Sequence, residues 1–365
     1  MKVSDVLSLY DFGSEIVDVS SYGNGRINKT YMIKCADGNS YILQMINSNV
    51  FKDVQGVMEN MGVVSTALTQ LRERDGRSSE SVLKVVPTKR GGTYCAFDGQ
   101  YFRVVNFIDN SVCLEAPQNA THMYELGRAI GEFHSDFDGF DASILNITIP
   151  NFHNTQARYS KFVADVAWPK SETRATKAYY DIMFLMERSD YAQIIVSEIK
   201  KGNLPIRVTH NDTKINNLLF DPNTGKAKAL LDFDTIMPDT LLYDVGDAVR
   251  SACNMGGEDQ EDLTQVVFNK EYYEAFINGY VSEMADKLTK EERDLLPYAP
   301  LVMTYELAIR FLNDYVNMDE YFGAVNEDDN LIRARVQMKL LKEMENNFEF
   351  ICQTTQEALN NQSQF

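Results

Sequence analysis

Apolar and polar residues alternate over much of roughly the first hundred positions, which is typical of strands that bury one face. The alternation predicts strands at residues 16–20, 28–35, 41–46, 82–87, 93–97 and 101–107. Asp37-Gly38 and Asp98-Gly99 are typical of tight hairpin turns, because glycine tolerates the backbone conformations that these turns need. After the third strand, apolar residues recur at spacings of three and four, which predicts one helix over residues 52–71.

From about residue 118 the apolar period becomes helical. A first helix, ending near His134, is marked by Met123, Leu126, Ile130 and Phe133. Further helices are predicted over residues 176–201, 270–288, 302–316 and 331–345. A short strand pair is predicted around Leu218 and Leu230, and the polar tail after Gln353 is expected to fray.

A strand-rich segment followed by a larger helical one predicts an α+β, two-lobed fold laid out as in protein kinases. We expect a small antiparallel-sheet lobe over residues 1–107 and a larger helical lobe over residues 108–365. In that layout the first lobe binds a nucleotide, and the second carries the catalytic and substrate-binding residues. The layout does not decide the function, because many α+β proteins share it.

Residues 208–217, Val-Thr-His-Asn-Asp-Thr-Lys-Ile-Asn-Asn, fit the pattern H-x-D-x-x-x-x-N. In kinases this loop supplies an aspartate that accepts or orients the substrate hydroxyl proton and an asparagine that binds magnesium. The spacing lets Asp212 face an acceptor while the chain turns and brings Asn217 to a metal. The pattern therefore predicts an ATP-dependent small-molecule kinase with Asp212 as its catalytic residue.

A hairpin is predicted directly after this loop, because the turn residues at 221–225 separate two short apolar runs. The hairpin would return Asp232 to the side of Asn217, so that two oxygen ligands meet as magnesium requires. The run Asp232-Phe233-Asp234 stands where kinases carry Asp-Phe-Gly. Each residue alone fits an ordinary hairpin with solvated turn residues, and only the ordered set favours the kinase interpretation.

The glycine turn near the N-terminus and two later aspartates each allow more than one interpretation. The run Gly23-Asn24-Gly25 is either a plain hairpin turn or a loop whose amides cover ATP phosphates, and the downstream catalytic loop favours the second. Asp244 is expected to hydrogen-bond the backbone of the catalytic loop. Asp247 is expected to face the acceptor, to cap a helix or to lie on a solvated face.

Composition excludes several classes of function. The net charge of −18 argues against a main role in binding nucleic acid. The five cysteines and four histidines are not spaced as zinc ligands, so the cysteines are expected to be reduced core residues. No apolar stretch is long enough to span a bilayer, and polar residues interrupt the first positions of the chain. We expect a cytoplasmic protein.

Residues 126–134, Leu-Gly-Arg-Ala-Ile-Gly-Glu-Phe-His, resemble the first large-lobe helix of the aminoglycoside phosphotransferase and choline kinase superfamily. Most of the chain resembles one group within it more closely, the N-acetylhexosamine 1-kinases. The matching runs are residues 22–28, 41–44, 209–217, 234–238, 310–312 and 321–322. The resemblance implies phosphorylation of the anomeric hydroxyl of N-acetylglucosamine or N-acetylgalactosamine, with ATP as co-substrate and Mg²⁺ as cofactor.

The resemblance also implies roles for individual residues. Asp212 matches the catalytic aspartate, and Asn217 and Asp232 match the metal ligands. Arg310 and Tyr321 match sugar-contacting positions, although by sequence alone they equally fit a surface cation and a core aromatic. The residues assigned to nucleotide binding are Gly23, Gly25, Arg26, Gln44, Asn106 and Ile108.

Gln44 departs from the broad kinase pattern, because the third strand usually carries a lysine that holds the α/β-phosphates. Glutamine donates hydrogen bonds but brings no charge. The helix glutamate that normally pairs with that lysine also has no counterpart on the apolar stripe, since Glu59 lies off it. The nucleotide charge would then be balanced mainly by magnesium, with a contribution that we hypothesise for Arg26.

Two other functions stay open. The same fold accepts other small molecules, so an aminoglycoside, methylthioribose, choline or homoserine is an alternative acceptor. The missing lysine also fits a catalytically dead, nucleotide-binding scaffold. Against the scaffold, Asp212, Asn217 and Asp232 are all present, and a protein without phosphoryl transfer has no chemical need for the three together.

Overall fold

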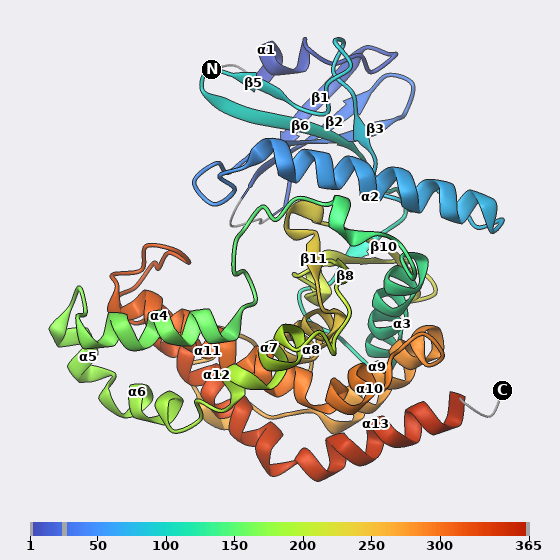
Figure 1. Cartoon of the computed structure of the whole chain (residues 1–365). Coiled ribbons are helices and arrows are strands. Elements are labelled where there is room, and N and C mark those ends of the chain that lie inside the picture. Colours follow the sequence, from blue (N-terminus) through green and yellow to red (C-terminus); the bar gives the residue numbers. More distant parts are fainter. Residues whose placement is uncertain (1–2, 24–27, 363–365) are drawn as a thin grey trace.

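A computed structural model describes residues 3–23 and 28–362. Its N-terminal lobe is an antiparallel sheet in the order β1-β2-β3-β6-β4, with β5 also paired to β6. The strands are β1 (Ile16–Ser21), β2 (Lys29–Cys35), β3 (Ser40–Ile46), β4 (Val85–Val86), β5 (Cys95–Phe97) and β6 (Gln100–Asn106). Two helices accompany them, α1 (Val3–Leu7) and α2 (Val54–Arg74), and Figure 1 shows α2 between the sheet and the helical region.

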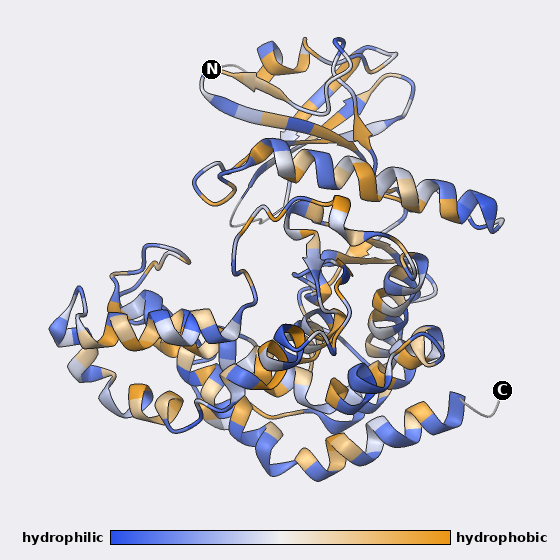
Figure 2. Ribbon diagram, in the orientation of Figure 1, coloured by the Kyte–Doolittle hydropathy of each residue, from blue (hydrophilic) through white to orange (hydrophobic). Residues whose placement is uncertain are grey.

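The two faces of this sheet bury different cores, because successive side chains of a strand point to opposite sides. On one face the apolar stripe of α2, with Val57 and Met61, packs with Ile42 and Val105. On the other face, residues from α1 and the chain after it pack with Ile33, Leu43, Phe102 and Val104. The hydrophobic positions of α2 recur among hydrophilic ones along the helix (Figure 2), as the sequence predicts. The core on the α2 side also includes Phe133 and Phe233 of the helical region, so it is shared between the two lobes.

The C-terminal region is built mainly of helices. They are α3 (Ala120–Asp136), α4 (Thr155–Ala167), α5 (Glu172–Lys177), α6 (Tyr179–Met186), α7 (Tyr191–Lys200), α8 (Leu241–Ala252), α9 (Lys270–Met284), α10 (Lys290–Leu295), α11 (Ala299–Val316), α12 (Asp329–Asn346) and α13 (Phe348–Gln362). Helices α3 and α9 pack backbone to backbone, since a side chain at Gly127 or Gly279 would collide with the main chain of the other helix. Helix α11 is buried along nearly all of its length.

Two small sheets lie where the helical region meets the N-terminal lobe. One contains β7 (Val112–Cys113), β9 (Leu218–Phe220) and β10 (Ala227–Leu230), and the other pairs β8 (Arg207–Thr209) with β11 (Met237–Asp239). The predicted α+β fold, with a sheet lobe and a larger helical region, is confirmed. The division at residue 107 follows the end of β6, but as a domain boundary it stays a prediction.

Several predicted elements are wrong in detail. The single helix over residues 176–201 is three helices, α5 to α7, because the chain turns at Ala178 and again after Met186. The tail does not fray at Gln353 but continues as α13, whose Ile351 and Leu359 are buried. The fourth strand is only β4, two residues long. Helices α1, α4, α8 and α10 are not predicted from the sequence.

The five cysteines are free, but only Cys35 and Cys253 are buried and Cys113 is exposed, so the expectation that they are all core residues is wrong. Among the described residues, no helix has the combined length and apolar character needed to cross a membrane.

Candidate active site

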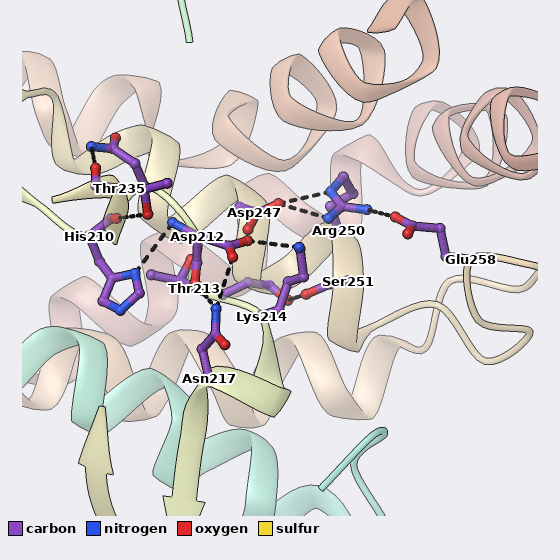
Figure 3. Close-up of polar contacts among 12 residues, drawn as sticks. His210, Asp212, Thr213, Lys214, Asn217, Thr235, Asp247, Arg250, Ser251 and Glu258 are labelled. Atoms are coloured by element: carbon purple, nitrogen blue, oxygen red, sulfur yellow. Dashed lines mark hydrogen bonds and ion pairs between the residues drawn. The ribbon is translucent and has the colours of Figure 1, made fainter. Parts of the chain in front are cut away.

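The predicted catalytic residue, Asp212, lies in the loop after β8 with both carboxylate oxygens in contact with polar neighbours (Figure 3). The Nζ of Lys214 lies 2.8 Å from Oδ1, and the Nδ2 of Asn217 donates to Oδ2 at 2.9 Å. Burial disfavours the charged carboxylate, but the Lys214 ammonium and the Asn217 amide outweigh it and hold the pKa of Asp212 below its usual value. The carboxylate is therefore ionised and oriented before a ligand binds.

Asp244 on α8 holds the backbone of the loop that carries Asp212 by hydrogen bonds. The backbone N–H of His210 donates to Asp244 Oδ2 at 2.8 Å, and that of Asn211 donates to Oδ1 at 2.6 Å. Asn211 has a left-handed φ of 65°, which asparagine tolerates better than most residues. This is the structural role that the sequence predicts for Asp244.

Asp247 takes none of the solvated or capping positions expected for it. It lies inside α8, is buried, and accepts hydrogen bonds from Arg250 Nη2 at 2.8 Å and Nε at 3.0 Å. The burial of α8 on all sides explains why these two alternatives fail, because an acidic residue there must pair with a cation rather than meet water. The alternative that Asp247 faces the acceptor stays a prediction.

The predicted metal residues, Asn217 and Asp232, come together at the base of the β9–β10 hairpin. The N–H of Leu231 donates to the carbonyl of Asn217 at 2.8 Å, which places Asp232 next to the loop. Asp232 has a left-handed backbone, with φ 58° and ψ 65°, an unfavourable conformation for a residue other than glycine. Burial, together with the charges of Asp234 and Asp212, raises the pKa of Asp232 to about 7.

These two residues fit a magnesium ion. Both hydrogen bonds from Asn217 Nδ2 go to Asp212, so its Oδ1 is the atom left to face a cation. Within the described chain the Asp232 carboxylate accepts no hydrogen bond, and a nearby divalent cation would relieve the repulsion that raises its pKa. No group of three or more His, Cys, Asp or Glu side chains in the described residues could hold a metal. Magnesium commonly uses only one or two protein carboxylates together with phosphates and water.

Gln44, at the position of the usual lysine, contacts a buried arginine that sequence reasoning missed. Gln44 on β3 and Arg103 on β6 are directly paired in the sheet, and Arg103 Nε donates to Gln44 Oε1 at 2.9 Å. Arg103 also forms an ion pair with Asp234, and both side chains are 1% exposed. Glu59 points elsewhere, to Gln55 and Asn146.

The other predicted nucleotide residues are placed only in part. Gly25 and Arg26 lie outside the described residues, and Gly23 has a left-handed φ of 74° at the end of the described segment. The side chain of Asn106 is occupied within its own lobe, accepting from Lys84 N at 2.6 Å and donating to Val82 O at 3.1 Å. Ile108 is buried at the start of the connector. Their nucleotide roles stay predictions.

The predicted sugar residues, Arg310 and Tyr321, lie together. The Arg310 guanidinium on α11 stands 5.1 Å from the ring centre of Phe152, 5.5 Å from Phe322 and 5.7 Å from Tyr321. Tyr321 is 49% exposed, and Arg310 Nη2 lies 3.5 Å from its hydroxyl. Tyr321 is thus not the core aromatic that sequence alone allows.

A buried chain of polar contacts joins Arg310 to the catalytic loop. Arg310 Nη1 lies 3.7 Å from Glu306 Oε1, which contacts His153 Nδ1 at 2.9 Å. The Nε2 of His153 lies 3.0 Å from the carbonyl oxygen of Asn211, the residue before Asp212. Burial disfavours the imidazolium, but the Glu306 carboxylate outweighs it and raises the pKa of His153.

Sequence reasoning missed four of these residues for different reasons. Lys214 lies inside the catalytic motif, but at a position where the pattern H-x-D-x-x-x-x-N specifies no residue. Arg103 had a usable signal, since a cation within the apolar run of residues 101–105 needs a buried partner. His153 and Glu306 had none, because only the fold brings them together.

Comparisons with known proteins identify the family and the fold of this chain. The sequence model of the phosphotransferase enzyme family matches residues 18–284. An aminoglycoside phosphotransferase from Alicyclobacillus acidocaldarius superposes with a TM-score of 0.57 at 14% identity, over 96% of this chain and 97% of that one. An amicoumacin kinase solved with AMP-PNP and Ca²⁺ superposes with a TM-score of 0.57 at 15% identity, over 94% of this chain and 92% of that one. A choline kinase from Streptococcus pneumoniae superposes with a TM-score of 0.51 at 14% identity, over 93% of this chain and 96% of that one.

At these identities the solved structures establish the fold and not the acceptor, so the resemblance to N-acetylhexosamine 1-kinases stays a prediction. The family match covers most of the chain and includes the candidate catalytic loop and the hairpin after it. The chain therefore belongs to the phosphotransferase enzyme family and has the fold of aminoglycoside phosphotransferases and choline kinases.

Proposed function

We propose that this protein transfers the γ-phosphoryl group of ATP, with Mg²⁺, to the anomeric hydroxyl of an N-acetylhexosamine. The observation that carries the proposal is the buried link from Arg310 through Glu306 and His153 to the backbone beside Asp212. This link holds a candidate sugar-binding pair, Arg310 and Tyr321, in fixed relation to the candidate catalytic carboxylate. The proposal is supported by the resemblance of the same residues to sugar kinases.

On the donor side, Asn217 Oδ1 and the Asp232 carboxylate would hold Mg²⁺, which neutralises phosphate charge when bound. The amicoumacin kinase was solved with an ATP analogue and a divalent cation, which supports a donor of this kind. Lys214, 2.8 Å from Asp212, adds a cation on the acceptor side. The protein supplies position and charge, which is most of what phosphoryl transfer requires.

Asp212 orients the acceptor. The anomeric hydroxyl donates a hydrogen bond to the Asp212 carboxylate, and its oxygen attacks the γ-phosphorus in line. The bond between that phosphorus and the β–γ bridging oxygen breaks, ADP leaves, and the hydroxyl proton passes to Asp212. A low pKa at Asp212 suits this order, because the hydroxyl becomes acidic only as its oxygen bonds to phosphorus.

The surroundings of Arg310 favour a neutral acceptor over a cationic one. Three aromatic rings, those of Phe152, Tyr321 and Phe322, already surround the guanidinium of Arg310, so they do not form an empty cage for choline. A second arginine lies nearby, because Arg158 Nη2 donates to the carbonyl oxygen of Phe152 at 2.9 Å, and burial and the Arg310 charge lower the pKa of Arg158. Two cations repel an amino alcohol or an aminoglycoside. They suit hydroxyl and amide oxygens, which accept from guanidinium donors.

An acceptor panel tests this proposal. N-acetylglucosamine, N-acetylgalactosamine, glucose, choline, aminopropanol and kanamycin are each assayed with ATP and Mg²⁺ by release of ADP. We expect kcat/KM to be about tenfold or more higher for the N-acetylhexosamines than for glucose, because the acetamido group adds a hydrogen bond to the site. Preference for choline, aminopropanol or kanamycin would contradict the acceptor assignment. No magnesium-dependent ADP release with any acceptor would favour the nucleotide-binding scaffold.

A further inference from the structure

Arg103 carries a charge into the middle of the N-terminal lobe. It lies on β6, a central strand, and its side chain is 1% exposed. An arginine cannot lose its proton under ordinary conditions, so its burial is tolerated only with full pairing. Such a costly group in a sheet core calls for an explanation in terms of what its partners do.

The ion-pair partner of Arg103 lies in the helical region, in the segment between β10 and β11. This partner is Asp234, two residues after the candidate metal ligand Asp232. Its Oδ1 accepts from Arg103 Nη1, and its Oδ2 accepts from Asn28 Nδ2 at 2.7 Å. The Oδ1 of Asn28 accepts in turn from the N–H of Asn47 at 2.9 Å. Asp234 is therefore bound by two groups of the N-terminal lobe, and the segment that carries Asp232 cannot move without breaking a buried ion pair.

The second contact of Arg103 fixes the orientation of Gln44. A guanidinium only donates, so the Gln44 atom at 2.9 Å from Arg103 Nε must be the carbonyl oxygen. The amide nitrogen of Gln44 is then the end left to donate elsewhere. Arg103 thus decides which end of Gln44 is presented away from the sheet core.

Helix α2 gives Arg103 no carboxylate. Its nearest contributions are the sulfurs of Met58 and Met61, 3.9 and 3.6 Å from Nη1. In the usual kinase arrangement a strand lysine pairs with a helix glutamate and also touches phosphate. Here the cation lies one strand further into the sheet and is paired with the metal-binding segment instead of the helix.

We propose that Arg103 is the positioning residue of the phosphate-donor site. It holds Gln44 with its amide NH₂ directed to the nucleotide phosphates, and through Asp234 it holds Asp232 at the metal position. One buried cation thereby couples the sheet to the metal-binding segment, whereas in other kinases the strand lysine couples the sheet to the helix through its glutamate. The inference rests on ATP and Mg²⁺ as the donor in the proposed function.

Substitutions at Gln44 test the first half of the proposal. Gln44→Glu keeps an oxygen for Arg103 but removes the NH₂, whereas Gln44→Met removes both. We expect Gln44→Glu to melt at the wild-type temperature and to bind ATP–Mg²⁺ about tenfold more weakly or worse, by calorimetry without acceptor. Gln44→Met should weaken binding and also lower the melting temperature, because Arg103 loses a partner. Wild-type ATP affinity in Gln44→Glu would overturn the proposal.

A double variant, Arg103→Met with Asp234→Asn, tests the second half by removing both buried charges together. We expect a folded protein in which the Mg²⁺ concentration for half-maximal ATP binding rises about tenfold. The matched control is Arg188→Met with Glu345→Gln, a pair at 3.0 Å between the α6–α7 turn and α12, which should leave the binding constants unchanged. A purely structural Arg103 would lower the melting temperature without changing the Mg²⁺ dependence, and that result would overturn the proposal.

The outcomes separate this inference from the proposed function. If the wild-type protein binds no ATP with Mg²⁺, the proposed donor is wrong, and the role of Arg103 falls with it. If the wild type binds ATP and the variants bind it equally well, only the role of Arg103 is wrong. If the double variant does not fold, the Gln44→Glu comparison decides, because that substitution leaves the ion pair intact.

Discussion

At the scale of single residues, the best-defined group is Asp212, held between Lys214 and Asn217. Asp212→Asn keeps the size of the side chain but cannot accept the acceptor proton as a carboxylate does. We predict wild-type melting and ATP binding, with kcat lower by about 10²–10⁴-fold. Steady-state kinetics and calorimetry on the same preparation check this, and a kcat near that of the wild type would rule Asp212 out as the proton acceptor.

Sequence alone predicts the residues of the site that act through a local pattern. Asp212, Asn217 and Asp232 belong to one loop and the hairpin after it, so short-range geometry is enough to bring them together. Arg103 and Asp234 are 131 positions apart, and their pairing depends on how the sheet meets the metal-binding segment. Spacing along the chain carries no information about that contact.

At the scale of elements, the loop that presents Tyr321 is held by Asp314 on α11. Asp314 Oδ1 accepts from the N–H of Tyr321 at 2.9 Å, and Oδ2 accepts from that of Phe322 at 2.8 Å and from Asn330 Nδ2 at 3.2 Å. Both oxygens are therefore needed to keep the loop in place.

Asp314→Asn turns an NH₂ group toward one of these donors, which should displace the loop. We predict that KM for the sugar rises by about three- to thirtyfold while ATP affinity stays unchanged. Lys170→Gln is the control, because it removes only an exposed ion pair with Glu320 in the same loop. An unchanged sugar KM in Asp314→Asn would argue against Tyr321 as an acceptor contact.

Helix α13 gives an independent test of the fold. Ile351 is fully buried, and Thr355 Oγ1 lies 2.7 Å from the buried Tyr273 hydroxyl of α9. We predict that Ile351→Ala lowers the free energy of unfolding by about 2–5 kcal/mol, measured by urea denaturation. Gln353→Ala, an exposed change in the same helix, should alter it by less than about 0.5 kcal/mol. Equal effects of the two would mean that the tail frays.

At the scale of the whole molecule, the buried pair of His153 and Glu306 links stability to pH. The pKa of His153 is raised, so its contribution is complete below the ordinary histidine pKa and is lost as pH rises through the raised value. The pKa of Glu306 is lowered, so its contribution is present above the ordinary carboxylate pKa and is lost as pH falls through the lowered value. The pair stabilises most between these two limits.

We therefore predict that the melting temperature of the wild type falls more steeply on the alkaline side than that of a His153→Gln, Glu306→Gln double variant. Scanning calorimetry of both proteins from acid to alkaline pH checks this. Parallel curves would show that the pair does not titrate with folding.

The overall fold could be predicted because the two lobes differ in apolar period, and that difference is local in the sequence. The predicted elements are wrong where tertiary contacts override the local sequence pattern. Helix α8 carries apolar residues at helical spacing, but its charged residues Asp244, Asp247 and Arg250 are buried too, which only tertiary contacts reveal. Helix α13 has a polar composition whose few buried residues are visible only beside α9.

The central claim is that the phosphoryl group moves to the anomeric oxygen of an N-acetylhexosamine. The most direct measurement is the position of phosphate in the product formed from N-acetylglucosamine or N-acetylgalactosamine with ATP and Mg²⁺, determined by phosphorus–proton and phosphorus–carbon couplings in NMR spectra. The account predicts coupling of phosphorus to the C1 proton and to C1 and C2. Phosphate on C6 or another hydroxyl would contradict it.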